Sequence, residues 1–267
     1  MRYLDEKFQR HWGGSDPFVQ LQSIEGKVYR EVKARKTFRF TLDGESYFAK
    51  LHFGVGWLEI FKNLIQFRLP ILGAENEWQA ISKLQTLGVA TMHFVAYGSS
   101  GWNPAARKSF IITRELKNID SLEDVCAHWK DNKPVYTYKR GLINEVARIA
   151  RVLHGNGICH RDFYLCHFLL HDSDGAQGNK PRLSLIDLHR ALIKKNLARR
   201  WLVKDIAGLY FSAMEIGLSR RDLFRFIKVY DQLDLRDSLV SKEGFWSAVE
   251  HRARSMYRKL APVNSAL

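Results

Sequence analysis

The chain has 267 residues, enough for one large domain or two lobes with a substantial core. With 46% hydrophobic and 12% aromatic residues, it is too apolar for a disordered protein. Lysine and arginine outnumber aspartate and glutamate by 42 to 28. The resulting formal net charge of +14 attracts phosphates, nucleic acid, anionic lipid or acidic protein without choosing among them.

Residues 19–53 predict a β-hairpin. The alternating runs GKVYREVKARKTFRFTL and ESYFAKLHF are joined by Asp43-Gly44, a dipeptide that favours a tight hairpin turn. Residues 74–87 predict a helix that ends at Gly88. Its apolar face is formed by Trp78, Ile81, Leu84 and Leu87. The runs ATMHFVAYGSS and KSFIITREL then predict two more strands, so the first third reads as two strands, a helix and two strands.

The pattern becomes helical after this point. The segment RGLINEVARIARVLHGNG predicts a helix that stops at Gly155-Asn156-Gly157, with one buried stripe formed by Leu142, Val146, Ile149, Ala150 and Leu153. The short apolar runs FLLH and LSLIDL follow, separated by the turn-rich DSDGAQGNKPR, and amphipathic helices are expected from about Leu192. We therefore predict an α+β, bilobal fold with a β-rich N-lobe at 1–117 and a larger helical C-lobe at 118–267.

No targeting or membrane-spanning segment is predicted. The opening MRYLDEKFQRHWGG lacks the apolar core of a secretory signal. No run approaches the ~18 apolar residues that a spanning helix needs. The cysteines Cys126, Cys159 and Cys166 are odd in number and form no CxxC pair, so we expect reduced thiols in a cytoplasmic protein.

Four charged residues follow one another in an order that suits phosphoryl transfer. Lys50 ends an alternating strand and can project from a rigid sheet, and Glu77 lies early in the next helix, where it can pair with that lysine. Asp162 lies in a loop after a helix and a very short strand, and Asp187 ends the run LSLI. Phosphoryl transfer needs a cation on the phosphates, a carboxylate on Mg²⁺ and a carboxylate that aligns the attacking hydroxyl. These residues supply all three groups.

The motifs around these residues resemble those of known kinases. His160-Arg161-Asp162 resembles the HRD catalytic loop of eukaryotic-type kinases, and Asp187-Leu188-His189 resembles their metal-binding DFG position. Asp205, in VKDIAGLYFSA, resembles the helix-borne aspartate that braces the catalytic loop of bacterial small-molecule kinases. The resemblance implies a protein-kinase-like fold.

Two longer stretches, HFGVGWLEIFKNLIQFRLPILGAENEW and HRDFYLCHFLL, resemble the lipopolysaccharide core heptose kinases of Gram-negative bacteria, specifically those that act on the first heptose. The match in length and motif order runs nearly end to end. The resemblance implies ATP- and Mg²⁺-dependent phosphorylation of the 4-hydroxyl of the first inner-core heptose. It also implies a lipid-anchored lipopolysaccharide acceptor, met at the cytoplasmic face of the inner membrane.

The resemblance also assigns a role to each site residue. Asp162 takes the catalytic-base position, supported by Arg161 and His160, while Asp187 takes the metal position, shared with His167. Lys50 takes the phosphate position and Glu77 pairs with it, with Glu75 as the alternative partner because the register is not fixed by sequence. The other expected nucleotide contacts are the hinge residues Thr113, Glu115 and Leu116 and the basic residues Lys33 and Lys36.

Two features depart from the protein-kinase pattern and leave alternatives open. The expected phosphate-covering segment EVKARKTFRF has no glycine, and His167 stands where an asparagine usually helps to hold a metal. Imidazole is a poorer ligand than an amide oxygen for Mg²⁺. Two alternatives to a sugar kinase therefore stay open: a protein kinase, and a pseudokinase that binds ligands without transferring phosphate. Zinc bound by Cys159-His160 and Cys166-His167 is disfavoured, because adjacent side chains on a strand point to opposite faces.

One apolar segment and one basic cluster indicate which partners the protein could bind. Gly56 to Leu72, GWLEIFKNLIQFRLPIL, predicts either an interfacial segment that touches lipid or a helix packed on the small lobe. The basic cluster in HRALIKKNLARRW follows the metal aspartate, where it would suit an anionic acceptor. An anionic membrane surface and an acidic protein are further expected partners. Nucleic acid is not expected, since no C₂H₂, basic-zipper or RRM signature occurs.

Overall fold

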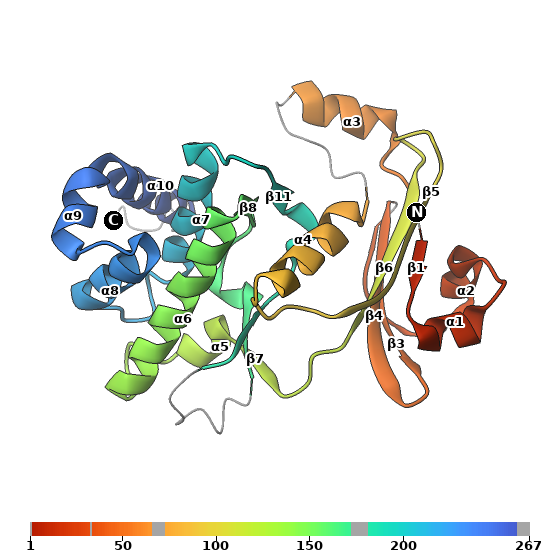
Figure 1. The fold of residues 1–267 in the computed structure, drawn as a ribbon, viewed down its shortest axis with the longest axis horizontal. Helices are drawn as coiled ribbons and strands as arrows, with labels where there is room; N and C mark the ends of the chain where they lie inside the picture. The colour runs from red at the N-terminus through yellow and green to blue at the C-terminus, as the bar shows by residue number, and fades with distance from the viewer. Residues whose placement is uncertain (1, 33, 66–72, 172–180, 261–267) are drawn as a thin grey trace, which may run out of the picture. The chain divides into compact units, whose positions relative to one another are not determined.

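The structure is a computed structural model that describes residues 2–32, 34–65, 73–171 and 181–260. The chain divides into two compact units (Figure 1). The first comprises Met1–Lys83, Thr91–Leu116 and Leu188–Arg190, and the second comprises Leu84–Ala90, Lys117–Asp187 and Ala191–Leu267.

The first unit is built on a six-stranded sheet in which every neighbouring pair is antiparallel. In spatial order its strands are β1 (Arg2–Leu4), β5 (Phe94–Ser100), β6 (Lys108–Arg114), β4 (Glu45–His52), β3 (Arg35–Leu42) and β2 (Lys27–Val32). Its helices are α1 (Glu6–Trp12), α2 (Pro17–Ser23), α3 (Gly56–Ile65) and most of α4 (Glu75–Thr86).

Side-chain alternation along β4 gives the sheet two different faces. Tyr47, Ala49 and Leu51 are buried in an apolar cluster with Phe8 of α1 and Leu21 of α2, so these two helices cover one face (Figure 1). The residues between them on β4, including Lys50, point to the other face, where Glu77 of α4 meets Lys50. The strand pattern thus determines the side on which Lys50 projects.

The β3–β4 turn is the predicted Asp-Gly hairpin. Leu42 pairs with Glu45 across the two-residue loop, and both loop residues have positive φ, +48° at Asp43 and +75° at Gly44. This conformation is that of a type I′ turn, whose twist matches that of the flanking strands. The prediction of a hairpin at this position is confirmed.

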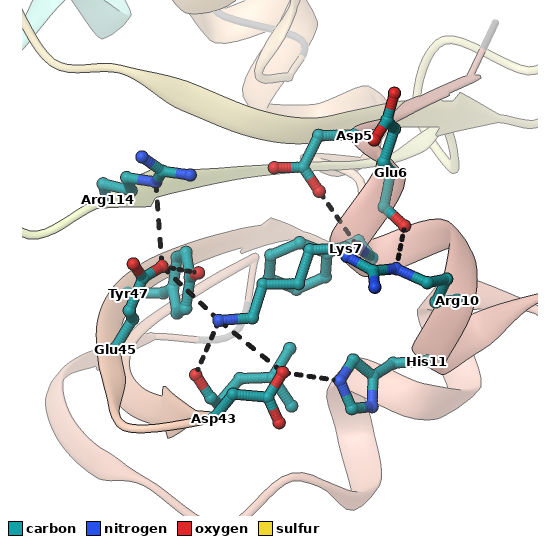
Figure 2. A network of polar contacts seen from close by, with 11 residues as sticks. Asp5, Glu6, Lys7, Arg10, His11, Asp43, Glu45, Tyr47 and Arg114 are labelled. Atoms are coloured by element: carbon teal, nitrogen blue, oxygen red, sulfur yellow. Dashed lines mark hydrogen bonds and ion pairs between the residues drawn. The ribbon is translucent and has the colours of Figure 1, made fainter.

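Polar contacts join α1 to this turn (Figure 2). The Lys7 ammonium donates to the Leu42 carbonyl oxygen at 3.2 Å and lies 3.4 Å from the Glu45 carboxylate. His11 lies 2.8 Å from the Asp43 carboxylate, and the Tyr47 hydroxyl donates to Glu45 at 2.6 Å. These contacts fix the N-terminal helix on the sheet at a point more than thirty residues away in sequence.

Two parts of the predicted N-lobe pattern were wrong. The long alternating run is two strands, β2 and β3, which turn between Val32 and Arg35. The turn escaped prediction because residues 33 and 34 are Lys and Ala, which carry no turn signal. In addition, the short strand β1 and the helices α1 and α2 come before the predicted hairpin; each helix is seven residues long, too short for helical periodicity to stand out.

The second unit is mostly helical. Its helices are α5 (Leu122–Cys126), α6 (Tyr136–Gly155), α7 (Arg199–Ser212), α8 (Arg220–Asp231), α9 (Leu235–Ser241) and α10 (Glu243–Leu260). Two small sheets accompany them, made of β7 (Ile119–Ser121), β9 (Phe168–His171) and β10 (Leu183–Leu185), and of β8 (Ile158–Cys159) and β11 (Leu192–Ile193). All five residues of the stripe predicted on α6 are buried, and the helical character after Leu192 is confirmed.

The mixed composition, with its sheet-rich N-terminal part, confirms the α+β prediction. All three cysteines are free. Among the residues that the structure describes, no helix combines the length and the apolarity needed to cross a membrane. Residues 66–72 and most of the predicted turn-rich segment, 172–180, lie outside the described residues.

His52, on the Lys50 face of β4, makes stability depend on pH. Burial, helped by the charges of Arg35 and Lys50, lowers its pKa from 6.5 to about 4. Between these values the unfolded chain binds a proton that the folded chain does not, so the free energy of unfolding falls as the pH falls, by an amount on the order of 3 kcal/mol. Urea unfolding at pH 7 and pH 5 should show a smaller loss for His52→Leu; an unchanged loss would contradict this cause.

Candidate active site

The first unit contributes a buried ion pair. Lys50 Nζ of β4 donates to Glu77 Oε1 of α4 at 2.5 Å, and Glu77 is fully buried. Glu75 instead pairs with Arg107 at 3.2 Å. Helical spacing explains the choice, because Glu77 lies four residues before the buried Ile81 and shares its face. The pair holds the Lys50 ammonium in a fixed direction on the sheet face opposite α1 and α2.

The residues predicted to form the hinge lie at the end of β6. Thr113 is buried within the strand, and Leu116 is partly buried. The Glu115 backbone N–H donates to the Ser46 carbonyl oxygen at 3.0 Å, and its carboxylate pairs with Arg39 at 2.8 Å. Since its amide is already used, the group that Glu115 can offer to a ligand at this position is its carbonyl oxygen.

Of the two basic residues predicted to contact phosphates, Lys33 and Lys36, the structure describes Lys36. Lys36 lies on β3, with its ammonium 3.8 Å from the Glu31 carboxylate. Lys33 lies outside the described residues. Because β2 and β3 form one hairpin, Lys36 is attached to a rigid ribbon at the edge of the sheet.

In the second unit, Asp205 holds the loop that carries Asp162. Asp205 lies on α7 and is fully buried. Its two carboxylate oxygens accept hydrogen bonds from the backbone N–H groups of His160, at 2.6 Å, and Arg161, at 2.8 Å. Burial raises the pKa of Asp205, but hydrogen bonding and charge from His154 outweigh this, and the pKa is lowered. A charged carboxylate therefore fixes the two residues immediately before Asp162.

The hydrogen bonds that Asp205 makes to the catalytic loop form a brace, and two residues that support it, His154 and Tyr230, were not identified from the sequence. His154, in the last turn of α6, lies 3.4 Å from Asp205 through Nε2 and 2.7 Å from the Tyr230 hydroxyl of α8 through Nδ1. The chain from Tyr230 to the loop thus spans three helices. Nothing local to His154 or Tyr230 marks them, since their partners are 51 and 76 residues apart from His154 in sequence.

His160 is fully buried and ties the loop to the residue before Asp187. Its Nε2 lies 2.9 Å from the Ile186 carbonyl oxygen, which can only accept, so Nε2 carries the hydrogen. Burial lowers the pKa of His160, which keeps the ring neutral. Among the described residues its Nδ1 has no hydrogen-bond partner. His160 therefore connects the two aspartates of the site through the backbone.

His167 and Asp187 face each other in the same unit. His167 Nδ1 lies 2.7 Å from the backbone carbonyl oxygen of Asp162, so Nδ1 is the donor. In the neutral ring Nε2 then bears the lone pair, and it lies 3.7 Å from Asp187 Oδ2. A lone pair and a carboxylate oxygen at this distance repel each other unless a proton or a cation lies between them.

The backbone is strained at Arg161, next to Asp162, and at Asp187. Arg161 and Asp187 have φ values of +73° and +61°, a left-handed conformation that costs non-glycine residues energy. The Arg161 guanidinium lies over the Trp201 ring of α7, 5.4 Å from its centroid. Such strain persists where surrounding contacts determine it, and here those contacts are the hydrogen bond that Asp205 accepts from the Arg161 N–H and the one that His160 donates to the Ile186 carbonyl oxygen.

The side chains of Asp187 and His167 fit a magnesium ion that a nucleotide brings into the site. Across the described ranges no group of three or more His, Cys, Asp or Glu side chains could hold a metal alone. Mg²⁺ is usually bound by one or two carboxylates with substrate phosphates and water supplying the remaining ligands. Asp187 Oδ2 with His167 Nε2 beside it supplies such a partial set.

Comparison with known proteins identifies the family. Residues 19–230 match the family described as "Lipopolysaccharide kinase (Kdo/WaaP) family". The chain belongs to this kinase family. It is 48% identical over 250 residues, 94% of each chain, to the lipopolysaccharide core heptose(I) kinase WaaP of Escherichia coli. It is also 46% identical over 256 residues, 96% of each chain, to the enzyme of that name from Pseudomonas aeruginosa.

A solved structure shows the same fold. The structure described as "WaaP in complex with acyl carrier protein" is 42% identical, has a TM-score of 0.84, and is matched over 96% of this chain and 99% of its own. The predicted kinase-like fold and the predicted family are therefore confirmed. As a member of a kinase family, the protein is a phosphotransferase that uses ATP.

Proposed function

We propose that this kinase phosphorylates the first heptose of the lipopolysaccharide inner core, on its 4-hydroxyl, at the cytoplasmic face of the inner membrane. The observation that carries the proposal is the 46–48% identity, over nearly the whole chain, to curated heptose(I) kinases. The arrangement of charged groups in both units supports it, since each group that phosphoryl transfer requires is present.

Each site residue has a role in this proposal. Lys50, oriented by Glu77, binds the nucleotide phosphates, and the carbonyl oxygen of Glu115 and the backbone of Leu116 meet the adenine. Asp187, with His167, would hold Mg²⁺, which would supply positive charge to neutralise the phosphates. Asp162 aligns the heptose hydroxyl and accepts its proton as the new P–O bond forms and the bond between the γ-phosphorus and the bridging oxygen of ATP breaks, which releases ADP. Asp205 and His160 fix the Asp162 loop, so that the base needs no rearrangement before transfer.

An acceptor comparison tests this function against a protein kinase and a pseudokinase. Labelled γ-phosphate of ATP is offered with three acceptors: core lipopolysaccharide lacking heptose phosphate, lipopolysaccharide truncated before the first heptose, and a mixture of bacterial proteins. We expect label on the first acceptor only. Label on protein would favour a protein kinase, and no transfer by a folded protein that binds ATP would favour a pseudokinase.

The role of His167 has a test of its own. His167→Ala removes Nε2 beside Asp187, and we expect the Mg²⁺ concentration for half-maximal turnover to rise by about tenfold, the lower end of what losing one interaction in a metal site costs. His167→Asn supplies an amide oxygen, which Mg²⁺ prefers, and should need less metal than His167→Ala. Equal Mg²⁺ dependence in all three proteins would remove His167 from the metal site.

We also propose that an acyl carrier protein, an acidic protein, binds this kinase. Support comes from the solved structure of WaaP in complex with acyl carrier protein and from the net charge of +14 of this chain. A cavity of about 640 Å³ in the second unit, lined mainly by apolar side chains of α5 to α10, offers space for an acyl chain. Calorimetry should show tighter binding of the acylated carrier than of the unacylated one. Equal affinities would exclude the cavity from the interaction.

A further inference from the structure

Helix α3 exposes the side chains that a surface helix normally buries. Leu58 is 89% exposed and Ile65 is 77% exposed, and Trp57 and Phe61 are each at least half exposed. Single exposed apolar residues are common on protein surfaces, but four within ten residues are not. Residues three and four apart share a helix face, so Trp57, Phe61 and Ile65 form one stripe with Leu58 beside it. Ile60, off this stripe, is buried.

A second segment brings another tryptophan to the same part of the first unit. The connection between β5 and β6 carries Trp102, which is fully exposed. The Gly56 N–H at the start of α3 donates to the Ala105 carbonyl oxygen of this connection at 2.9 Å. A Cβ placed on Gly54 would lie 2.5 Å from the same oxygen, so the two backbones are in direct contact. Figure 1 shows α3 beginning beside this connection.

We propose that α3 and the β5–β6 connection form a surface that inserts into the interfacial layer of an anionic phospholipid bilayer. Tryptophan is favoured at the boundary between headgroups and acyl chains, and the apolar side chains beside it add buried area. Lys62 on α3 and Lys108 at the start of β6 are exposed basic residues of the same two segments. The net charge of +14 adds a long-range attraction to an anionic surface.

The chemistry of the surface favours lipid over a folded protein as its occupant. Large apolar side chains project from α3 beside Lys62, and Lys108 starts the adjoining strand β6, so an anionic headgroup layer complements both the apolar and the basic groups. The inference rests on the proposed function in one respect: a kinase of a lipid-anchored acceptor must work at a membrane. Binding to lipid is nevertheless measurable without any kinase activity.

Vesicle flotation tests the surface directly. We expect the wild-type protein to bind vesicles of phosphatidylcholine with phosphatidylglycerol, and to bind phosphatidylcholine alone more weakly. Trp57→Gln, Phe61→Gln and Ile65→Gln together keep residues compatible with a helix, and should weaken binding by about tenfold or more. Trp102→Gln should weaken it less. The matched control, Val19→Gln with Val240→Gln, changes exposed apolar residues of α2 and α9 and should bind like the wild type.

Two acceptor forms separate this inference from the proposed function. The triple variant should phosphorylate a lipid-free core oligosaccharide at the wild-type rate but lose activity on lipopolysaccharide embedded in vesicles. Loss on both would place α3 in the kinase chemistry and overturn the inference. Wild-type protein that ignores anionic vesicles, or a triple variant that binds them equally, would also overturn it. So would sedimentation showing a dimer that only the triple substitution dissociates, since the face would then join two copies.

Discussion

Asp162→Asn is expected to lower turnover by about 10²–10⁴, the usual contribution of a positioned base. The substitution preserves size and removes the group that takes the proton from the acceptor hydroxyl. The contact between His167 and the loop uses the backbone carbonyl of residue 162, so the side-chain change leaves it in place. ATP binding and thermal stability should therefore stay near wild-type values. Steady-state transfer to heptose-containing core lipopolysaccharide measures the effect.

A matched control for this experiment is Asp120→Asn, an exposed aspartate on β7 of the same unit, which should leave turnover unchanged. Near-normal turnover by a correctly folded Asp162→Asn protein would show that another group takes the proton or that the base is dispensable. A large loss of ATP affinity would instead assign Asp162 to nucleotide binding.

Asp205→Asn should lower both stability and turnover, because it breaks the brace of the catalytic loop. One carboxylate oxygen becomes an NH₂ group, which cannot accept the hydrogen bond that the His160 or Arg161 N–H donates. Leaving a buried donor unsatisfied, next to a buried His154, costs about 3 kcal/mol of unfolding free energy. Since the loop carries Asp162, we expect the folded fraction to turn over at least tenfold more slowly, because misplacing the base weakens its contribution.

Asp222→Asn provides the control for a buried aspartate outside the site. Asp222 on α8 is 7% exposed, pairs with Lys139 at 2.9 Å and accepts from the Ser219 N–H at 2.9 Å. This variant should lose stability while keeping the turnover of its folded fraction. If Asp205→Asn behaves in the same way, with turnover intact, Asp205 only stabilises the fold and does not position the base.

The pH dependence of this brace has a defined sign. The pKa of Asp205 is lowered in the folded protein relative to its ordinary 3.8, because hydrogen bonding and charge from His154 outweigh burial. Its stabilising contribution is therefore complete above that value and is lost only as the pH falls below it. The acid loss assigned to His52 begins at higher pH, so the two effects can be separated by titration.

Features with a local physical cause were predictable from the sequence. Asp43-Gly44 specifies a turn through the conformations open to those residues, and Gly88 ends α4 with a φ of +67° for the same reason. The stripe on α6 follows from helical periodicity alone. The partner of Lys50 was narrowed to Glu75 or Glu77, and the buried face of α4, which Glu77 shares with Ile81, selects Glu77.

Features that depend on distant contacts were not predictable in this way. The chain from Tyr230 through His154 to Asp205 exists only because three helices pack together, and no local pattern records it. The tautomer of His167 is set by the Asp162 carbonyl, a backbone atom that no residue type reveals. For α3, an apolar stripe predicts one covered face, and periodicity does not say whether protein or lipid covers it.

The position of the transferred phosphate shows whether this kinase acts on the first heptose. After reaction with labelled ATP, tandem mass spectrometry and phosphorus NMR of the core glycan show which sugar and which hydroxyl carry the new phosphate. We predict a single phosphate on the 4-hydroxyl of the first heptose, formed by the wild type and not by Asp162→Asn. Phosphate on a Kdo sugar, or on protein, would contradict it.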